Sequence, residues 1–147
     1  MREYKLYAKL KKCEFWLDRD HFLGHVVTKD RISVEPTKVE AIVNWPRPTT
    51  MIEVKSFLGM VGYYRRFVEG FSKLALPMTR LIRKNTKFDW SEECEQSFQE
   101  LKKRLASAPV LVIPKGTKGF VIFSDASKRG LGCVLMQKGT VFADASR

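Results

Sequence analysis

The residues with the clearest chemical character lie in the segment SFLGMVGYYRRF, residues 56–67, and they have the chemistry of a polyanion-binding surface. The apolar spacing is that of a helix, yet Gly59 and Gly62 fall in its interior. A glycine inside a helix is less favourable than an alanine by roughly 1 kcal/mol. Two glycines beside Tyr63 and Arg66 indicate that a large ligand approaches the backbone closely. Such a face is suited to lie along a nucleic acid.

The predicted helix must hold these residues on one side. A capping box of Thr50 and Glu53 opens the helix, which we expect to continue to about Val68. At about 100° per residue, one side gathers the apolar core residues Val54, Phe57, Leu58, Val61, Tyr64 and Val68. The neighbouring side, which we expect to face solvent and to bind, holds Lys55, Gly59, Gly62, Tyr63 and Arg66.

The charge of the chain favours a polyanion partner. Its 147 residues carry a formal net charge of +11, and the segment from Met51 to Lys87 has eight basic but only two acidic residues. Nucleic acid is therefore the first partner class and an anionic membrane the second. No apolar run approaches the roughly 20 residues that span a bilayer, and no signal-peptide core is present. We therefore expect no membrane partner.

The cysteines and histidines form no catalytic or metal-binding pattern. Cys13, Cys94 and Cys133 are odd in number and far apart, and no Cys/His cluster has zinc-ligand spacing. We therefore expect no disulfide framework and a reducing compartment, cytoplasmic or nuclear. His21 is expected to be solvated. His25 has two open interpretations, a hydrogen-bonded structural histidine or a neighbour of nucleic acid.

The remaining segments predict an α+β fold. We expect extended segments at 15–17, 22–27 and 32–34, turns at 18–20 and 28–31, and further strands at 120–123, 133–136 and 141–143. Further helices are expected from Pro36 to before Pro46, over 72–84, and from the N-cap Ser91 to before Pro109. The last three strands have no helix to cover them, so we interpret them as part of a larger sheet fold.

Six motifs in order make the chain resemble the pol polyprotein of gypsy-type long-terminal-repeat retrotransposons, over essentially its whole length. They are KLKKCEFW (9–16), FLGHVV (22–27), VEPTKVEAIVNWPRPTT (34–50), SFLGMVGYYRRFVEGFSK (56–73), FDWSEECEQSFQELKKRLASAPVL (88–111) and FVIFSDASKRGLGCVLMQKG (120–139). One motif alone would be weak, but six in the right order and spacing are highly specific.

The resemblance implies a role for each motif. KLKK is similar to a late palm motif of reverse transcriptase near the incoming nucleotide, matched by Lys11 or Lys12. FLGH is similar to the primer grip that holds the primer 3′ end, formed by Phe22, Leu23, Gly24 and His25. The long helix is similar to the thumb helix that tracks the minor groove of the template–primer, through Lys55, Gly59 and Tyr63 with Gly62 and Arg66 beside them. FSDAS matches the first catalytic, metal-binding carboxylate of ribonuclease H with Asp125.

The same resemblance implies four parts. Residues 1–35 would be the end of the reverse-transcriptase palm with its primer-grip hairpin, and residues 36–87 the helical thumb. Residues 88–114 would form a connecting helix, and residues 115–147 the first strands of a truncated RNase H-like sheet. The implied class is again α+β, with a small palm-type hairpin, a helical thumb and an incomplete sheet.

Two absences limit the chemistry that we expect of the chain alone. Nucleotidyl transfer needs carboxylates that hold two magnesium ions, but the upstream palm motif and the Y/F-x-D-D turn do not occur. Of the ribonuclease H carboxylates only Asp125 is present, and Asp144 stands where relatives usually have an aromatic residue. We expect Mg²⁺ as a cofactor of the intact parent only, and no polymerase or nuclease activity from this chain.

The expected function is that of a fragment of a reverse transcriptase–ribonuclease H, which binds a template–primer duplex or RNA–DNA hybrid and the remainder of the polyprotein. The intact parent would copy RNA into DNA and degrade the RNA of the hybrid. Two alternatives stay open, a non-catalytic nucleic-acid-binding module and a decayed retroelement reading frame without function. Lys11 and Lys12 can also be an exposed charge pair.

Overall fold

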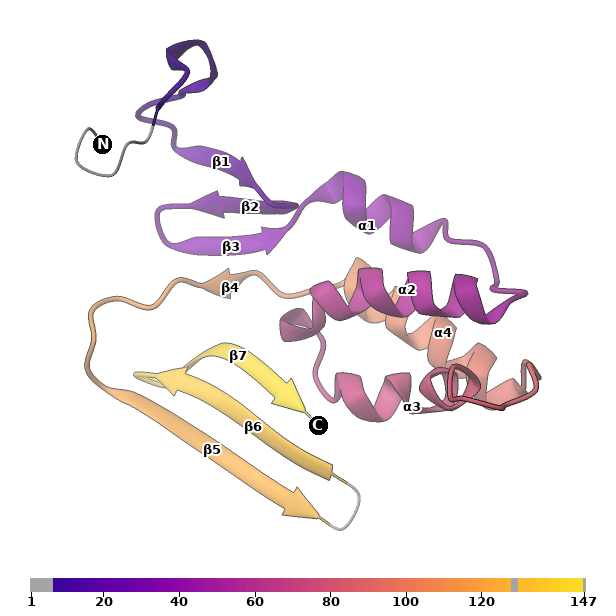
Figure 1. Cartoon of the computed structure of the whole chain (residues 1–147). Coiled ribbons are helices and arrows are strands. Elements are labelled where there is room, and N and C mark those ends of the chain that lie inside the picture. Colours follow the sequence, from indigo (N-terminus) through magenta and orange to yellow (C-terminus); the bar gives the residue numbers. More distant parts are fainter. Residues whose placement is uncertain (1–6, 128–129, 147) are drawn as a thin grey trace.

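The computed structural model describes residues 7–127 and 130–146, which form two antiparallel sheets and four α-helices (Figure 1). The first sheet has the strand order β1-β2-β3-β4 and the second the order β5-β6-β7. The helices lie beside the first sheet, and the second sheet lies below β4 in the view of Figure 1. The predicted α+β class is confirmed.

The first sheet combines a three-stranded meander with one strand from much later in the chain. Its strands are β1 (Arg19–Phe22), β2 (His25–Thr28), β3 (Arg31–Val34) and β4 (Leu111–Val112). The meander is antiparallel throughout, with Phe22 opposite His25 and Val26 opposite Ser33. β1 begins within residues 18–20, which the polar side chains had predicted to be a turn.

Two predicted strands differ from the structure. Residues 15–17 are not a strand, because Trp16 has a φ of 62°, is fully exposed, and has no described strand to pair with. Residues 22–27 are two strand ends around a turn at Leu23 and Gly24, whose φ angles are 49° and 76°. Positive φ at both turn residues matches the twist of a hairpin. Leucine gives no sequence signal for it, because its Cβ disfavours this conformation.

Three of the four α-helices begin where the sequence predicted, and the helix predicted over 72–84 without a cap spans residues 71–81. They are α1 (Pro36–Val43), α2 (Met51–Tyr63), α3 (Phe71–Leu81) and α4 (Glu92–Ala106), with single 3₁₀ turns η2 (Leu10–Lys12) and η3 (Arg65–Phe67). Pro36 occupies the first turn of α1, and Ser91 caps α4 by accepting the Cys94 N–H at 3.3 Å. Over the described residues, none of these helices is long and apolar enough to cross a membrane.

α2 opens on the predicted capping box. Thr50 Oγ1 accepts the N–H of Glu53 at 3.2 Å, and the Glu53 carboxylate accepts the N–H and the hydroxyl of Thr49 at 2.7 and 3.0 Å. These hydrogen bonds to the carboxylate lower the pKa of Glu53. The bonds fix the start of α2 and therefore the register of its outer face.

α2 ends at Tyr63, well before the predicted end at Val68. One tightened turn, η3, follows, and 3₁₀ turns are common at helix ends. Val68 is extended, and Gly70 has a φ of 63°, so the chain turns back there and starts α3. The sequence prediction was wrong here because the apolar spacing continues through Phe67 and Val68, which are buried without being in the helix.

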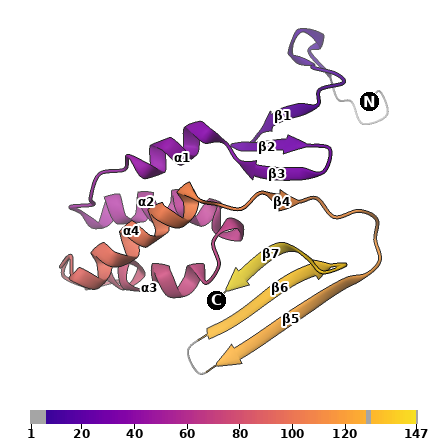
Figure 2. The ribbon, with the colours of Figure 1, turned by 180° about the vertical axis from the view of Figure 1, so that it is seen from behind.

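The main apolar core lies between the helices. Phe57 of α2 is fully buried, with its ring centre 4.6 Å from that of Phe98 on α4 and 5.9 Å from that of Trp45. α4 contacts both α1 and α3, and Figure 2 shows it crossing between them. The predicted inner face of α2 is confirmed, since Val54 and Val61 are fully buried as well.

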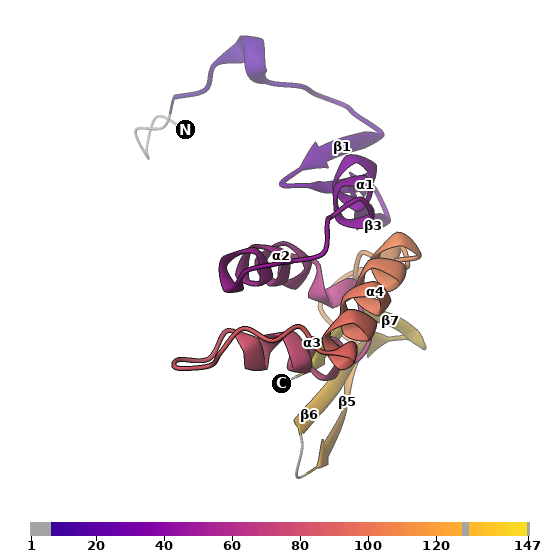
Figure 3. The same ribbon diagram turned by 90° about the vertical axis from the view of Figure 1, so that its right-hand side faces the viewer.

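The second sheet contacts the helices through its last strand. It consists of β5 (Phe120–Ser127), β6 (Gly130–Gln137) and β7 (Thr140–Ser146), and Figure 3 shows β5 and β6 extending away from the helices. Ser72, in the first turn of α3, donates its N–H to Ser146 Oγ at 3.0 Å and its hydroxyl to Ser146 O at 2.7 Å. Ser146 of β7 thereby accepts the N–H of Ser72, which has no acceptor within α3.

The segment between β4 and β5 is bonded to both sheets, by hydrogen bonds to one and by an ion pair to the other. The buried side chain of Gln137 accepts the Lys115 N–H at 3.2 Å and donates to the carbonyls of Lys115 and Lys118 at 3.0 and 2.7 Å. Lys115 Nζ lies 2.7 Å from Asp30 Oδ1 in the turn between β2 and β3. The connection therefore has a defined path, although it contains no helix or strand.

Candidate nucleic-acid interface

The outer face of α2 carries three of the residues predicted to bind. Lys55, Gly59 and Tyr63 follow one another at four-residue spacing, which places them on one helix face, and we call them the α2 stripe. All three are exposed, Tyr63 with 49% of its surface. Figure 3 shows α2 and α3 projecting together, away from α4. The stripe is therefore open to a large ligand.

Packing within the described chain requires neither glycine of α2. A Cβ on Gly59 would meet no atom within 4 Å, and one on Gly62 would meet only Phe71 Cζ, at 3.9 Å, an ordinary contact. Neither residue has a positive φ. Alanine would be more favourable in a helix at both positions. The fold does not explain these glycines, and what they provide is a helix surface without side chains.

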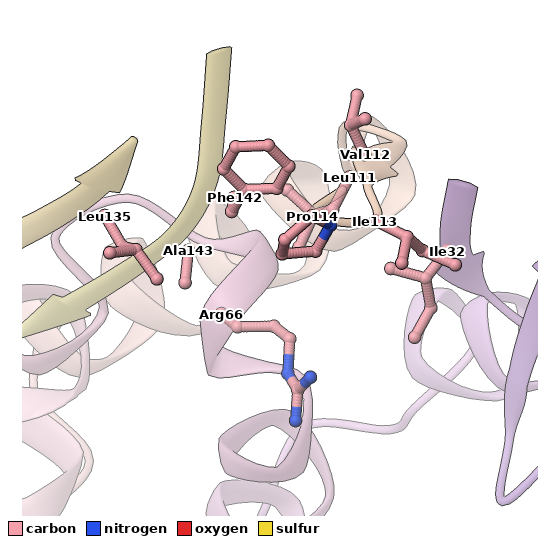
Figure 4. Close-up of a pocket in the computed structure, with 9 residues that line it drawn as sticks. All are labelled: Ile32, Arg66, Leu111, Val112, Ile113, Pro114, Leu135, Phe142 and Ala143. Carbon is pink, nitrogen blue, oxygen red and sulfur yellow. The ribbon is translucent and has the colours of Figure 1, made fainter. Parts of the chain in front are cut away.

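Arg66 does not lie on the α2 stripe, in contrast to the prediction from helical periodicity. It belongs to η3 and lines a cavity of about 330 Å³ between the two sheets (Figure 4). The rest of the lining is apolar and includes Ile32, Leu111 and Phe142. Figure 4 shows the guanidinium of Arg66 directed away from Phe142. The early end of α2 is the reason, because it takes Arg66 out of the helical repeat.

The predicted primer-grip residues form the turn between β1 and β2, and this turn lies against the C-terminal end of α2. The hydroxyl of Tyr63 donates to Leu23 O at 2.8 Å, and that of Tyr64 donates to Gly24 O at 3.1 Å. The side chains of Phe22 and Leu23 are exposed. The structure therefore joins two predicted sets of binding residues that are 40 residues apart in sequence.

His25 lies beneath the turn, not on its surface. Only 6% of its surface is exposed, and its ring centre lies 5.3 Å from that of Tyr63, 5.4 Å from that of Tyr64 and 5.8 Å from that of Phe67. Its Nδ1 lies 3.1 Å from Leu23 O, so Nδ1 carries the proton and donates. Of its two interpretations, this placement supports the structural one.

Tyr64 is the site residue that sequence reasoning missed. Periodicity predicts it as core, and the residue is indeed 2% exposed, with burial raising the pKa of its hydroxyl. Nothing in the sequence indicates that the hydroxyl bonds to Gly24. The one available signal is chemical, because a buried tyrosine needs a partner for its hydroxyl, whereas phenylalanine does not.

Lys11 and Lys12 lie apart from this surface. Both are exposed in the 3₁₀ turn η2, and Figures 1 and 3 place this segment beyond β1, far from the α2 stripe. The structure does not bring them together with the other predicted site residues. Their assignment to a polymerase site stays a prediction.

Asp125 is not grouped with further metal-ligating side chains among the described residues. It is exposed on β5, and within residues 7–127 and 130–146 no three His, Cys, Asp or Glu side chains are grouped to hold a metal ion. Mg²⁺ needs several converging oxygen ligands to displace its water. These residues do not fit a two-metal centre, and we derive no metal-dependent step from them.

Asp144 contacts the start of α3 and does not pair with Asp125. Its carboxylate accepts the N–H of Gly70, while burial and the nearby charge of Glu69 raise its pKa above the usual 3.8. In the sheet, Asp144 pairs with Val134 and Asp125 with Gly132, which precedes Val134 by two residues in β6. Asp144 and Ser146 together give β7 two contacts with the first turn of α3.

The variant Asp144→Asn is expected to be more stable than the parent at neutral pH. The pKa of Asp144 in the folded chain lies above 3.8. Between 3.8 and that raised pKa the folded chain keeps a proton that the unfolded chain has released. The free energy of unfolding therefore falls as the pH rises through this interval. An asparagine removes this penalty, and its carbonyl can still accept the Gly70 N–H. Urea unfolding from about pH 3 to pH 7 should give a difference that vanishes at the acid end. A variant less stable than the parent at neutral pH would contradict this account.

The known proteins similar to this chain include Pol polyproteins, and a family model matches its C-terminal part. Residues 90–145 match the family model of the RNase H-like domain found in reverse transcriptase. The Drosophila melanogaster protein described as the retrovirus-related Pol polyprotein from transposon 297 is 41% identical over all of this chain, and that from transposon gypsy is 34% identical over 93% of it. The chain spans 14% of the length of each of these polyproteins.

Solved structures agree with the sequence matches. The foamy viral protease-reverse transcriptase in complex with an RNA/DNA hybrid superposes with a TM-score of 0.81 at 26% identity, over 94% of this chain and 19% of that one. The complex of the foamy viral protein with double-stranded DNA gives a TM-score of 0.80 at the same identity, over 94% of this chain and 30% of that one. The chain belongs to the reverse transcriptase–RNase H region of retrotransposon and retroviral Pol polyproteins, as its six motifs indicated.

Proposed function

We propose that this chain binds the template–primer duplex of reverse transcription, an RNA–DNA hybrid or double-stranded DNA, through the α2 stripe and the neighbouring turn. One observation carries the proposal: Gly59 is an exposed mid-helix glycine where a Cβ would meet nothing in the chain. A helix loses stability there without any gain in packing. Close approach of a ligand to the backbone accounts for that loss.

The chemistry of the surrounding residues suits a duplex. A bare helix face at Gly59 and Gly62 fits against the shallow minor groove of an A-like hybrid, where sugar edges and 2′-hydroxyls are displayed. The ammonium of Lys55 lies one turn away and suits a phosphate, and the half-exposed ring of Tyr63 suits a sugar. The +6 charge of residues 51–87 adds attraction that does not depend on base sequence.

The wider assignments are also proposals. We assign residues 1–35 to the palm end, 36–87 to the thumb, 88–114 to the connection and 115–147 to an RNase H-like sheet. Copying of RNA into DNA and cleavage of the RNA of the hybrid are proposed for the whole polyprotein, with Mg²⁺ as its cofactor. For the chain by itself we propose binding without catalysis, and magnesium-dependent primer extension by the purified chain would contradict this.

A titration with a short, end-labelled RNA–DNA hybrid tests the proposed function. The chain is expected to bind the hybrid with an affinity that falls steeply as salt rises from about 50 to 200 mM, because phosphate contacts release counterions. Single-stranded RNA of the same sequence serves as the competitor. Absence of hybrid binding at the lowest salt, by a chain that unfolds cooperatively on heating, would overturn the proposal.

Lys55→Ala is expected to lower the steepness of that salt dependence by about one unit in the log–log slope, because one phosphate contact is lost. The matched control is Lys103→Ala, which removes an equal charge from an exposed position on α4. Both variants lower the net charge by one, so only a local contact distinguishes them. Equal slopes for the two variants would mean that Lys55 makes no such contact.

A further inference from the structure

The turn at Leu23 and Gly24 is bonded far more extensively than an ordinary hairpin turn. Leu23 O accepts from the Tyr63 hydroxyl at 2.8 Å and from His25 Nδ1 at 3.1 Å. Gly24 O accepts from the Tyr64 hydroxyl at 3.1 Å and from the Glu35 N–H, also at 3.1 Å. Each carbonyl of the turn thus receives two donors, and a carbonyl oxygen has two lone pairs.

The turn is also shaped to admit these donors. A Cβ on Gly24 would lie 2.6 Å from the Tyr64 hydroxyl oxygen, so glycine is needed there for the approach as well as for its φ of 76°. Leu23 adopts a φ of 49°, which is unfavourable for a residue with a Cβ. Such strain persists only where the surroundings fix it, and it gathers at ligand clamps and active sites.

The donors come from a closed aromatic cluster. The rings of Tyr63, Tyr64 and Phe67 surround His25, and the centres of the two tyrosine rings are 5.0 Å apart at an angle of 84°. Nε2 of His25 is buried and has no hydrogen-bond partner among the described residues. Burying an unpaired polar atom is unfavourable. It is tolerated here in an arrangement that directs Nδ1 at the turn.

We infer that Tyr63, Tyr64 and His25 are positioning residues that lock the turn to the end of α2, so that Phe22 and Leu23 meet the same duplex as the α2 stripe. This inference rests on the proposed duplex binding, and it separates the residues that contact the duplex from those that position the turn. Tyr63 belongs to both parts, since its ring is half exposed on the stripe and its hydroxyl holds the turn. Tyr64 and His25 are buried and act on the duplex only through the turn.

The burial of Tyr64 makes the inference testable. At 2% exposure its hydroxyl cannot touch a ligand, so any effect of Tyr64→Phe on duplex affinity is transmitted by the turn. The substitution deletes one oxygen and keeps the ring in the core. Tyr7→Phe is the matched control, because it deletes the same atom from a fully exposed tyrosine.

The experiment is a double-mutant cycle on hybrid affinity. Phe22→Ala is expected to weaken binding about three- to tenfold in the parent chain but less than about twofold in the Tyr64→Phe background, because the unlocked turn no longer presents Phe22. Tyr64→Phe alone should weaken binding about as much as Phe22→Ala, and Tyr7→Phe should change nothing. Thermal melts show which variants are folded at the assay temperature. If Tyr64→Phe does not melt cooperatively, the cycle is run with Tyr63→Phe, and only its coupling to Phe22→Ala is interpreted, because Tyr63 also lies on the α2 stripe.

The outcomes separate this inference from the proposed function. If the parent binds the hybrid but Phe22→Ala has the same effect in both backgrounds, the positioning role is wrong and duplex binding stands. If Tyr64→Phe binds as tightly as the parent, the positioning role is likewise wrong. If the parent does not bind the hybrid, the proposed function fails, and this inference fails with it.

Discussion

Gly59→Glu is expected to lower the affinity of the chain for an RNA–DNA hybrid by at least about 100-fold, because a like-charge contact is unfavourable by several kcal/mol. The glutamate places a carboxylate and its stem on the bare face where the proposed ligand approaches. The fold should be unaffected, since even a Cβ at this position meets nothing within 4 Å. Fluorescence anisotropy with the labelled hybrid measures the loss, and a thermal melt checks the fold.

Gly59→Ala is the companion variant, and its two effects have opposite signs. A methyl group inside an exposed helix raises the free energy of unfolding by roughly 0.5–1 kcal/mol. The same group should weaken hybrid binding, because it separates the helix from the groove. A variant that is more stable and binds as well as the parent would show that close approach at Gly59 is not the reason for the glycine.

Phe57→Ala is expected to destabilise the chain by about 3–5 kcal/mol. Phe57 is fully buried, and its ring contacts those of Phe98 and Trp45, so its removal leaves a cavity in the core that joins α2 and α4. A loss of this size is a large part of the roughly 5–15 kcal/mol that stabilises a domain. Urea unfolding followed by tryptophan fluorescence reports it directly, because Trp45 lies in the same cluster.

Ile52→Ala controls for the loss of apolar surface from the same helix. Ile52 lies one turn before the α2 stripe with 75% of its surface exposed. Its substitution is expected to change the free energy of unfolding by no more than about 0.5 kcal/mol. Comparable destabilisation by both substitutions would mean that α2 does not pack through Phe57.

The α2 stripe could be predicted from the sequence because its signals are local. The capping box at Thr50 fixes the start of the helix, and the apolar period fixes its inner face, so Lys55, Gly59 and Tyr63 follow as neighbours on the outer one. What local signals do not contain is the end of a helix that is set by tertiary structure. Arg66 was misplaced for that reason, since the apolar period continues across η3.

The contact between the turn and α2 could not be predicted from the sequence, for a different reason. Leu23 at positive φ contradicts its own preference, and the four hydrogen bonds that fix the turn come in part from tyrosines 40 residues away. Trp16 is the reverse case, where strong apolar character predicted a strand without any described strand to pair with. Pairing is a non-local property, and propensity alone does not supply it.

The exposed outer edge of β5 is suited to pairing with another chain. β5 has one neighbour in the described sheet, so its outer edge offers backbone donors and acceptors, and its side chains Val121, Ile122 and Phe123 are exposed apolar residues. An edge of this kind is a template for another extended segment, including β5 of a second molecule. Self-association grows with protein concentration, whereas the affinity of one chain for a hybrid does not. Self-association through β5 is therefore expected at high protein concentration, and dilution disfavours it.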